Sequence, residues 1–424
     1  MLEHQKDIRR FCIGTAVLMI LAGFLMNSPS EIAQGLWKIL TSRDTLITDY
    51  FALANYGAAF INAGCVLLFS IGLIDGTKIP YTGLTLAALF INAGFGFWGK
   101  NPVNVIPIVL GTRLYAMRQG MPFGRYVYTA LFATCLAPFF TELIYILPFS
   151  FGVNLLIGAA TGLFIGYVMP PLSMHTASMH MGYSLFNVGF SAGILAFIMY
   201  CVLRAFGIQT ETVLIWQTEV HPAITIGTLV YFAATFFYGL WLEKGNIKGL
   251  KKIFRHPGKA VSDFILMDGA GNTFMNMGLM GFVAELYILF IGGQVSGPVL
   301  GSILTLFGFS AFGAHLKNYL PVLAGVVLAG FFMIYDLHSP ALLIAAMFVV
   351  GVSPISGQFG PFAGLVAGAL HVAIVMCTAP LYGGLNLYNN GFSAGWVAIL
   401  MVPLAESFMH HFEIRKQKRK NKKG

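Results

Sequence analysis

The sequence predicts an all-α polytopic membrane protein with about 14 transmembrane segments, arranged as two inverted seven-span repeats with some broken helices. Three observations predict this fold. Of the 424 residues, 57% are hydrophobic and only 10% are charged, whereas soluble domains carry about a quarter charged residues. Apolar stretches of the roughly 20 residues that cross a bilayer recur along the chain. The motifs of the first half also return, in the same order, in the second half.

The predicted spans follow one another with short connections. We expect the first at 11–27, because it is apolar and no small-residue cleavage site of a signal peptide follows it. The 49 glycines and 18 prolines suit close helix packing and helices that break within the membrane. The other spans are expected at residues 50–75, 80–99, 102–118, 125–149, 151–171, 184–205, 222–242, 264–293, 296–313, 319–336, 341–356, 361–380 and 384–406.

Basic residues predict the orientation. They gather at 6–10, 244–259 and 415–423, and each group adjoins a hydrophobic segment. With the N-terminus inside and 14 crossings, 21 Lys and Arg residues lie on the inner side and four on the outer side. This bias follows the positive-inside rule, so we expect an inner-membrane protein with both termini cytoplasmic. Anionic lipid then explains the net charge of +9, and nucleic acid is not an expected partner.

An internal repeat is the most informative feature of the sequence. The segment from Asp49 to Gly64 returns as Asp263 to Gly278, 214 residues later. Eight further residues, from Gly83 to Gly111, return at the same spacing. Two Gly-x3-Gly-x3-Gly runs and two Asn-x-Gly-Phe-Ser-Ala-Gly runs follow at a spacing of 202. Apolar low complexity does not produce several matches in the same order, so we interpret the chain as a duplication.

The repeat also predicts the domain boundaries. We place the first membrane repeat at 1–207, an external connection at 208–221, and the second membrane repeat at 222–406. The second repeat carries a basic cytoplasmic loop at 244–259, and a basic cytoplasmic tail follows at 407–424. Because seven is an odd number of spans, the second repeat enters the membrane from the opposite side. Such inverted repeats are typical of secondary transporters.

Polar residues duplicated in the middle of the spans are the candidate solute site. Transporters with inverted repeats bind their solute near the membrane midplane, where the repeats meet. An amide offers donors and an acceptor without the cost of a charge, which suits a neutral or weakly charged solute. The alternative is that these side chains only bond neighbouring helices. The candidate substrate-binding residues are Asn62, Asn104, Asn187, Ser191, Asn276, Asn318, Gln358, Asn389 and Ser393.

Duplicated prolines predict where helices break. Pro107 and Pro321 lie within apolar segments, each three residues after an asparagine. Proline removes one helical hydrogen bond and obstructs another, which frees carbonyl groups for an ion or a polar solute. We therefore expect 102–118 and 319–336 to be broken, or shorter than a full span, at these prolines.

Ionisable residues within spans are costly and are therefore candidates for function. Glu142 and Asp268 each occur in one repeat only, and we expect them to couple transport to an ion. The other candidates are Glu285 and His371, with His315 and Lys100 nearer the span ends. No cofactor, metal site or catalytic residue is predicted, because no nucleotide loop, metal-ligand spacing or nucleophile motif is present in its required context. We therefore expect that the protein is not an enzyme.

The segments Leu185–Gly193 and Leu387–Gly395 carry a resemblance to a known family. Each contains Asn-x-Gly-Phe-Ser-Ala-Gly, which resembles the hallmark of an uncharacterised bacterial multi-pass membrane family with a duplicated domain of unknown function. The resemblance covers nearly the whole chain and implies no substrate. The seven-plus-seven count is distantly similar to inverted-repeat nucleobase and anion transporters. The Asn-Pro-Val-Asn of 101–104 is faintly similar to urea channels, which also duplicate a pore module.

The expected function is that of a secondary transporter that moves a small polar or anionic solute across the cytoplasmic membrane. The expected partners are this small molecule or ion and the lipid bilayer, and a homodimer is compatible with the architecture. Two alternatives stay open. One is a passive solute channel of the urea-channel type, and the other is a non-transporting membrane scaffold or sensor.

Overall fold

The described chain folds into α-helices and short 3₁₀ turns. The computed structural model describes residues 4–210 and 213–420. Within these ranges, ten helices are long and apolar enough to cross a membrane, and three shorter apolar helices accompany them. The chain is therefore an α-helical, multi-pass membrane protein, which confirms the predicted class.

The two halves of the chain contain the same succession of helices. In the first half these are α1 (Gln5–Met26), α2 (Pro29–Thr41), α3 (Tyr50–Leu53), α4 (Tyr56–Thr77), α5 (Gly83–Phe95), α6 (Ile106–Arg118), α7 (Val127–Ala133), α8 (Ala137–Ile146), α9 (Phe151–Met179) and α10 (Asn187–Ala205). In the second half they are α11 (Pro222–Leu242), α12 (Lys248–Ile253), α13 (Phe264–Asp268), α14 (Ala270–Phe290), α15 (Gly297–Phe309), α16 (Leu316–Phe332), α17 (Pro340–Phe348), α18 (Ser353–Phe359), α19 (Pro361–Thr378) and α20 (Asn389–Lys420).

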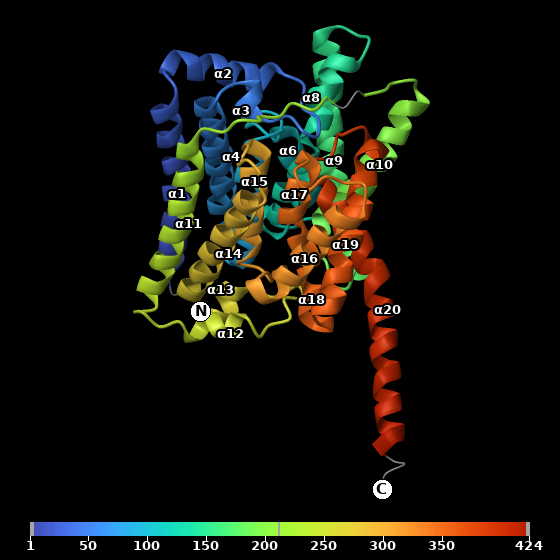
Figure 1. Ribbon diagram of the computed structural model, residues 1–424. Coiled ribbons are helices and arrows are strands. Elements are labelled where there is room, and N and C mark those ends of the chain that lie inside the picture. Colours follow the sequence, from blue (N-terminus) through green and yellow to red (C-terminus); the bar gives the residue numbers. More distant parts are fainter. Residues whose placement is uncertain (1–3, 211–212, 421–424) are drawn as a thin grey trace.

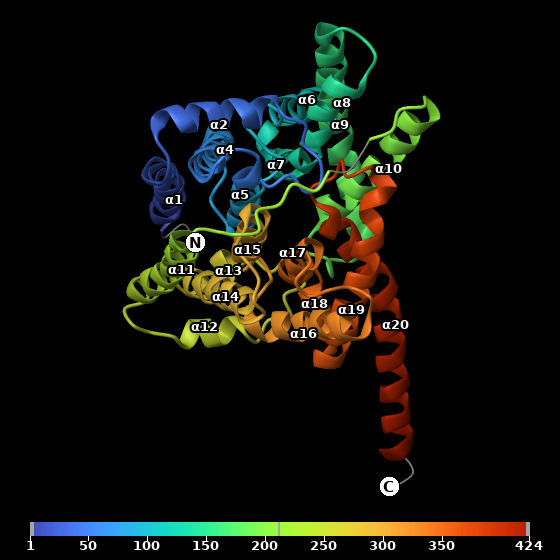
Figure 2. The ribbon, with the colours of Figure 1, turned by 45° about the horizontal axis from the view of Figure 1, so that its top comes forward.

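Equivalent helices also pack in equivalent ways. In the first half α1 packs on α4 and α6 packs on α9, and in the second half α11 packs on α14 and α16 packs on α19. The halves meet mainly where α5 contacts α15 and where α10 contacts α20. Figure 2 shows α5 and α15 at the boundary between the first and second halves, with α10 and α20 at one edge of the molecule.

The contact between α5 and α15 is so close that it requires glycine. A Cβ atom on Gly94 would lie 2.3 Å from the carbonyl oxygen of Gly301, and one on Gly301 would lie 2.4 Å from that of Gly94. Farther along the pair, a Cβ atom on Gly308 would lie 3.0 Å from the carbonyl oxygen of Leu86. The late part of one helix thus contacts the early part of the other, so α5 and α15 run antiparallel.

Two short helices mark the opposite ends of the bundle. Figure 1 shows α2 lying across one end and α12 lying across the other, and we call these the α2 end and the α12 end. The helix α2 begins with a capping box formed by Ser28 and Glu31, and Pro29 occupies its first turn. It buries Ile32 and exposes Trp37. The last helix, α20, extends beyond the bundle at the α12 end (Figure 1).

The helix interruptions do not lie where the duplicated prolines predict them. The expected break at Pro321 is wrong, because α16 continues through this residue, but the alternative of a helix shorter than a full span is confirmed, because α16 has 17 residues. Pro107 lies in the first turn of α6, a helix of only 13 residues, where its missing N–H costs nothing. The interruptions are instead the 3₁₀ turns at 134–136, between α7 and α8, and at 349–352, between α17 and α18.

Candidate functional site

Each half of the chain holds the start of a central helix of the other half. Asp263 accepts hydrogen bonds from the backbone N–H groups of Gly83 and Leu84 at the start of α5, at 2.9 and 3.2 Å. Asp49 in turn lies against Gly297, the first residue of α15, where a Cβ atom would lie 2.4 Å from the Asp49 carboxylate oxygen Oδ1. A carboxylate is favourable there because it satisfies free N–H groups and faces the positive end of the helix dipole. The two halves are therefore interlocked by reciprocal contacts.

Asn62 and Asn276 hold the segments that follow these central helices. The Asn62 side-chain amide donates to the carbonyl oxygens of Gly96 and Lys100, both at 2.7 Å. The Asn276 amide donates to the carbonyl oxygens of Ser310 and Ala314, at 2.7 and 2.8 Å. Both asparagines are buried. Their amide donors thus satisfy backbone carbonyls that would otherwise lack partners after the helix ends.

Asn104 and Asn318 form equivalent turns before α6 and α16. The Asn104 amide donates to the carbonyl oxygen of Gly99 at 3.2 Å, and the Asn318 amide donates to that of Gly313 at 2.9 Å. Asn104 also donates to the Asp44 carboxylate at 3.3 Å. Both asparagines are buried, and each hydrogen bond lies within one half of the chain.

Asn187 and Asn389 open α10 and α20, where each accepts hydrogen bonds from the preceding helix. The Asn187 side-chain oxygen accepts from the Thr176 hydroxyl at 3.0 Å and lies 3.0 Å from the His180 ring nitrogen Nε2. The Asn389 oxygen accepts from the Thr378 hydroxyl at 2.5 Å and from the Tyr382 hydroxyl. Two copies of one polar cluster therefore face α9 and α19, with a histidine in the first copy and a tyrosine in the second.

The other polar candidates divide into buried and exposed positions. The Ser191 hydroxyl lies 2.6 Å from the Thr176 hydroxyl, beside Asn187. The Ser393 hydroxyl donates to the carbonyl oxygen of Asn389 at 3.4 Å. Gln358 is exposed on α18. The structure thus places both serines beside the asparagine clusters, and it does not bring Gln358 together with them.

The two carboxylates expected to couple transport to an ion lie near opposite ends of the bundle. Glu142 is fully buried on α8 and pairs with Arg43, whose side chain is 44% exposed. Asp268 is fully buried at the end of α13 and lies 2.9 Å from His256 and 3.3 Å from Lys252. Each buried carboxylate therefore has a more exposed cationic or titratable partner, and the two sites are separate.

A cavity of about 230 Å³ adjoins one of the asparagine clusters. Asn389 and Asn390 line it, together with Leu46 of the first half and residues of α17 and α19. Asn390 is in turn bonded to the buried His371, whose Nε2 lies 3.0 Å from the amide oxygen. Segments of both halves therefore enclose this cavity, and a duplicated polar cluster forms part of its wall. It is a solute-sized space at two residues of the asparagine cluster.

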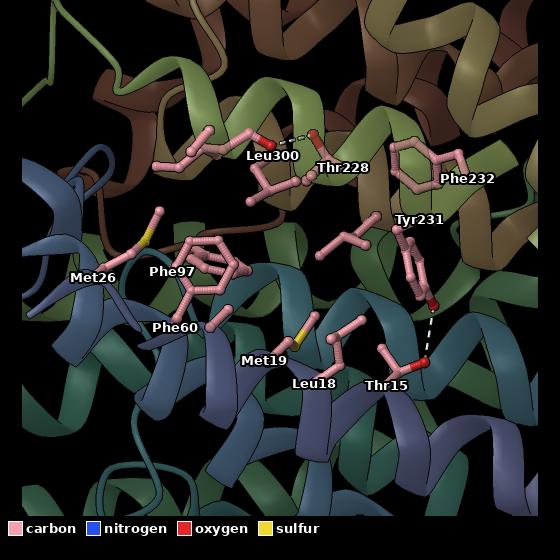
Figure 3. Close-up of a pocket in the computed structure, with 15 residues that line it drawn as sticks. Thr15, Leu18, Met19, Met26, Phe60, Phe97, Thr228, Tyr231, Phe232 and Leu300 are labelled. Carbon is pink, nitrogen blue, oxygen red and sulfur yellow. Dashed lines mark hydrogen bonds between the residues drawn. The ribbon is translucent and has the colours of Figure 1, made fainter. Parts of the chain in front are cut away.

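A second cavity, of about 160 Å³, lies between α1 and α11 and is mostly apolar (Figure 3). Its lining includes Met19 from α1, Phe60 from α4 and Leu304 from α15. Near one end, the hydroxyl groups of Thr15 and Tyr231 lie 2.9 Å apart and join the two halves. The cavity contains few polar groups, so it is poorly suited to a polar solute.

Aromatic rings fill the space between the interrupted helices. The Phe186 ring lies 4.7 Å from that of Phe309 and 5.0 Å from that of Tyr388, and Phe348 lies 5.9 Å from both Phe186 and Tyr388. Phe95 lies 5.9 Å from Tyr388. These rings come from both halves of the chain, and they close the centre of the molecule.

Backbone hydrogen bonds cross between the halves at the same level. The N–H group of Leu387 donates to the carbonyl oxygen of Cys135 at 3.1 Å, within the 3₁₀ turn of the first half. The N–H group of Leu185 donates to the carbonyl oxygen of Gly351 at 2.9 Å, within the 3₁₀ turn of the second half. Each helix interruption thus presents a carbonyl group that the other half binds, which keeps the irregular backbone satisfied inside the membrane.

A model of the family described as "Protein of unknown function (DUF1576)" matches residues 28–205 and 242–407. The chain belongs to this family. One matched segment falls in each half, which is consistent with the duplicated domain that the sequence resemblance implied. No curated protein and no solved structure matches the chain significantly. The distant likeness to seven-plus-seven transporters and to urea channels therefore has no support from these comparisons.

Two features of this DUF1576 protein are missing from the predicted site. Asp49 and Asp263 open a repeated motif, which was a usable signal, but repetition does not identify the partner of either residue. Lys100 was expected near a span end, and the structure instead buries it fully, because α5 ends at Phe95 and the chain turns inward. Its ammonium donates to the Asn92 side-chain oxygen at 2.9 Å. This cation lies in the core, beside the aromatic cluster.

Proposed function

We propose that this DUF1576 protein is a secondary transporter that moves a small polar or anionic solute between two inverted seven-span repeats. The seven spans of the first repeat are α1, α4, α5, α6, the interrupted pair α7–α8, α9 and α10. The matching elements of the second repeat complete 14 spans, among which α5, α6, α15 and α16 are short. The antiparallel packing of α5 on α15 supports the inversion. The positions of the equivalent helices α2 and α12 at opposite ends support it as well (Figure 1).

The charge distribution supports an assignment of the α12 end to the cytoplasm. Four lysines (Lys244, Lys248, Lys251 and Lys252) lie in or just before α12. The basic C-terminal part of α20 extends from the same end (Figure 1). Basic residues are retained on the cytoplasmic side of inner-membrane proteins. In this orientation both termini are cytoplasmic and the α2 end faces outward.

The proposal rests on the reciprocal contacts between the two halves. Each half holds the other at a helix start, through Asp49 and Asp263, and at a helix interruption, through Leu185 and Leu387. The same contacts occur in both directions. Each half can therefore adopt the conformation of the other half while these contacts between the halves are kept. One conformation then opens toward the α2 end, and its counterpart opens toward the α12 end. This is alternating access as inverted repeats perform it.

We assign the cavity beside Asn389 to one of these two conformations. Its lining combines a duplicated polar cluster with segments from both halves. The equivalent cluster in the first repeat surrounds Asn187, and we propose that a matching cavity forms there in the other conformation. A continuous pore is disfavoured because the aromatic rings between Phe95 and Tyr388 close the centre. This favours a transporter over the passive channel.

We retain Glu142 and Asp268 as the candidates for ion coupling. Each is a fully buried carboxylate whose partner includes a more exposed group, so the pair can separate when a conformation opens. A proton or a sodium ion could then replace the partner. Their positions near opposite ends suit residues that are exposed alternately.

Flux measurements in proteoliposomes test the proposal. Purified protein should catalyse saturable uptake of at least one labelled solute from a panel of small neutral metabolites, carboxylates and inorganic anions. Preloading the vesicles with the unlabelled solute should accelerate the uptake by exchange. Uptake that does not saturate and shows no exchange acceleration would indicate a channel. No uptake of any solute would favour a scaffold or sensor.

A further inference from the structure

The buried ammonium group of Lys100 lacks a negatively charged partner in the described part of the chain. It donates to the Asn92 side-chain oxygen at 2.9 Å and lies 4.9 Å from the centre of the Phe95 ring. The Cys135 thiol is also within electrostatic reach. An amide, an aromatic ring and a thiol stabilise a cation only partly, whereas a buried ion normally requires a counter-ion. The described surroundings of Lys100 therefore offer no counter-ion to a protonated ammonium group.

Two further donors near Lys100 also lack acceptors. The Trp98 ring nitrogen and the Tyr388 hydroxyl are both buried without a hydrogen-bond partner among the described residues. The rings of Trp98 and Tyr388 lie 5.2 and 5.9 Å from that of Phe95, the ring that the ammonium also contacts. An indole N–H can only donate, and a lysine ammonium can only donate. The three donors thus belong to side chains around the Phe95 ring, and within the described part of the chain they lack a hydrogen-bond acceptor other than the Asn92 oxygen.

The positions equivalent to these three by the internal repeat carry no side-chain hydrogen-bond donor. At the equivalent positions Trp98 corresponds to Phe312, Lys100 to Ala314, and Tyr388 to Phe186. The frame around these positions is otherwise duplicated, including the Asn62 and Asn276 bonds to the carbonyl groups of Lys100 and Ala314. At the equivalent positions, Phe312, Ala314 and Phe186 therefore fill the space without a polar side chain. The polar set, with Trp98 and Lys100 from the first repeat and Tyr388 from the second, requires a separate explanation.

We propose that Lys100, Trp98 and Tyr388 form the binding site for a small anion at the interface of the repeats. This inference rests on the proposed transport function and specifies the class of its solute as anionic. The anion accepts hydrogen bonds from the ammonium, the indole N–H and the phenol, and it neutralises the buried charge. Charge-assisted hydrogen bonds of this kind are the strong ones in proteins. In this occluded conformation the aromatic cluster shields the site.

Anion-dependent thermal stabilisation tests the site independently of flux. Purified protein in detergent is heated in the sodium salts of chloride, nitrate, formate or phosphate, each compared with gluconate at equal ionic strength. We expect at least one of these anions to raise Tm in a saturable manner, because ligand binding to the folded state stabilises it. Lys100→Ala should abolish the response. Trp98→Phe and Tyr388→Phe should each raise the half-saturating concentration by roughly tenfold.

The choice of variants keeps this test decisive. All three substitutions introduce the residue that the other repeat carries at the equivalent position, so the surrounding frame accommodates them. Lys38→Ala removes an exposed lysine on α2 and serves as the control that keeps the full response. If Lys100→Ala fails to fold, the two phenylalanine variants still report on the site. An anion response that survives in all three variants, or no response in the wild type, overturns the proposal.

The site and the transport function can fail separately. Saturable stabilisation by an anion that requires Lys100 supports the site, even if proteoliposomes show no flux of that anion. That combination would contradict transport and leave a static anion site. Saturable flux of a neutral solute without any anion response would support transport and overturn the anion site.

Discussion

Asp263, in the second half of the chain, binds the N–H group of Gly83 at the start of α5 in the first half, at 2.9 Å. The reciprocal contact joins Asp49 to Gly297 at the start of α15. The same pair of residue types thus joins the halves in both directions. This relationship explains why the repeated motif begins with aspartate in each copy. It also means that each half contributes a carboxylate to the start of a central helix in the other.

Removal of either carboxylate should destabilise the fold. Asp263→Ala and Asp49→Ala each leave backbone N–H groups without an acceptor, and an unsatisfied buried group costs about 1–3 kcal/mol. We expect each variant to lose this much in unfolding free energy, measured by SDS titration of the purified protein in mixed micelles. Asp336→Ala, which removes an exposed carboxylate, should have little effect. Equal stability of Asp263→Ala and Asp336→Ala would contradict the capping role.

Asn62 and Asn276 should contribute equally to stability. Replacing either by the similarly sized leucine leaves two buried carbonyl groups unpaired, so each variant should lose about 1–3 kcal/mol or more. The same SDS titration measures both losses. If these amides bound solute and did not hold the backbone, the variants would keep wild-type stability and lose only solute affinity. That result would reassign both residues.

The stability of the α2 end should depend on pH through Asp44, which lies between α2 and α3. Burial raises the pKa of its carboxyl group above the ordinary value of 3.8, although Tyr50 donates to it at 2.8 Å. The folded protein therefore holds this proton more tightly than the unfolded chain does. The contribution of Asp44 to the unfolding free energy should fall as the pH rises from 3.8 to the raised pKa of Asp44. Above that pKa the contribution should stay constant.

Asp44→Asn removes this titration and should flatten the pH profile of stability over that window. Thermal unfolding at a series of pH values measures both proteins. Identical pH profiles for the wild type and Asp44→Asn would show that the pKa of Asp44 is the same in the folded and unfolded states, contrary to this prediction.

Neutralisation of Glu142 or Asp268 should change the dependence of flux on an ion gradient. Glu142→Gln and Asp268→Asn keep the side-chain shape and remove the charge that a coupling ion would bind. We expect at least one variant to retain exchange of solute and to lose acceleration by a proton or sodium gradient. Flux in proteoliposomes with and without each gradient measures this. Unchanged gradient dependence in both variants would leave the carboxylates as structural partners of Arg43 and of Lys252.

The sequence was sufficient to predict the membrane class and the duplicated positions, because both depend on composition and spacing along the chain. The equivalence of Asn62 with Asn276 therefore reappears as identical hydrogen bonds. The exchanged contacts of Asp49 and Asp263 could not be predicted, since a repeat identifies equivalent residues and not their partners.

The helix interruptions were expected at Pro107 and Pro321. They lie instead directly before another duplicated pair, Pro138 and Pro354, in the first turns of α8 and α18. The spacing of prolines alone does not show which pair follows an interruption.

Lys100 shows a second limit of sequence reasoning. Charged residues near span ends normally reach the membrane surface, which is why this lysine was expected near a boundary. Its burial results from the early end of α5 at Phe95 and from the bond of its own carbonyl group to Asn62. Both depend on contacts between helices that are distant in the sequence.

Reciprocal accessibility of two equivalent residues tests alternating access most directly. Val375 lines the cavity beside Asn389, and its equivalent Ser173 is buried beside Asn187. In a protein whose exposed Cys201 and Cys377 are replaced by serine, Val375→Cys should react with a membrane-impermeant thiol reagent only from the α2 end. Ser173→Cys should react only from the α12 end. In a protein that carries both new cysteines, modification at position 375 should hold that cavity open and sharply reduce the reactivity at position 173. Labelling of both positions from the same side, or labelling at 173 that is unaffected by modification at 375, would contradict the account.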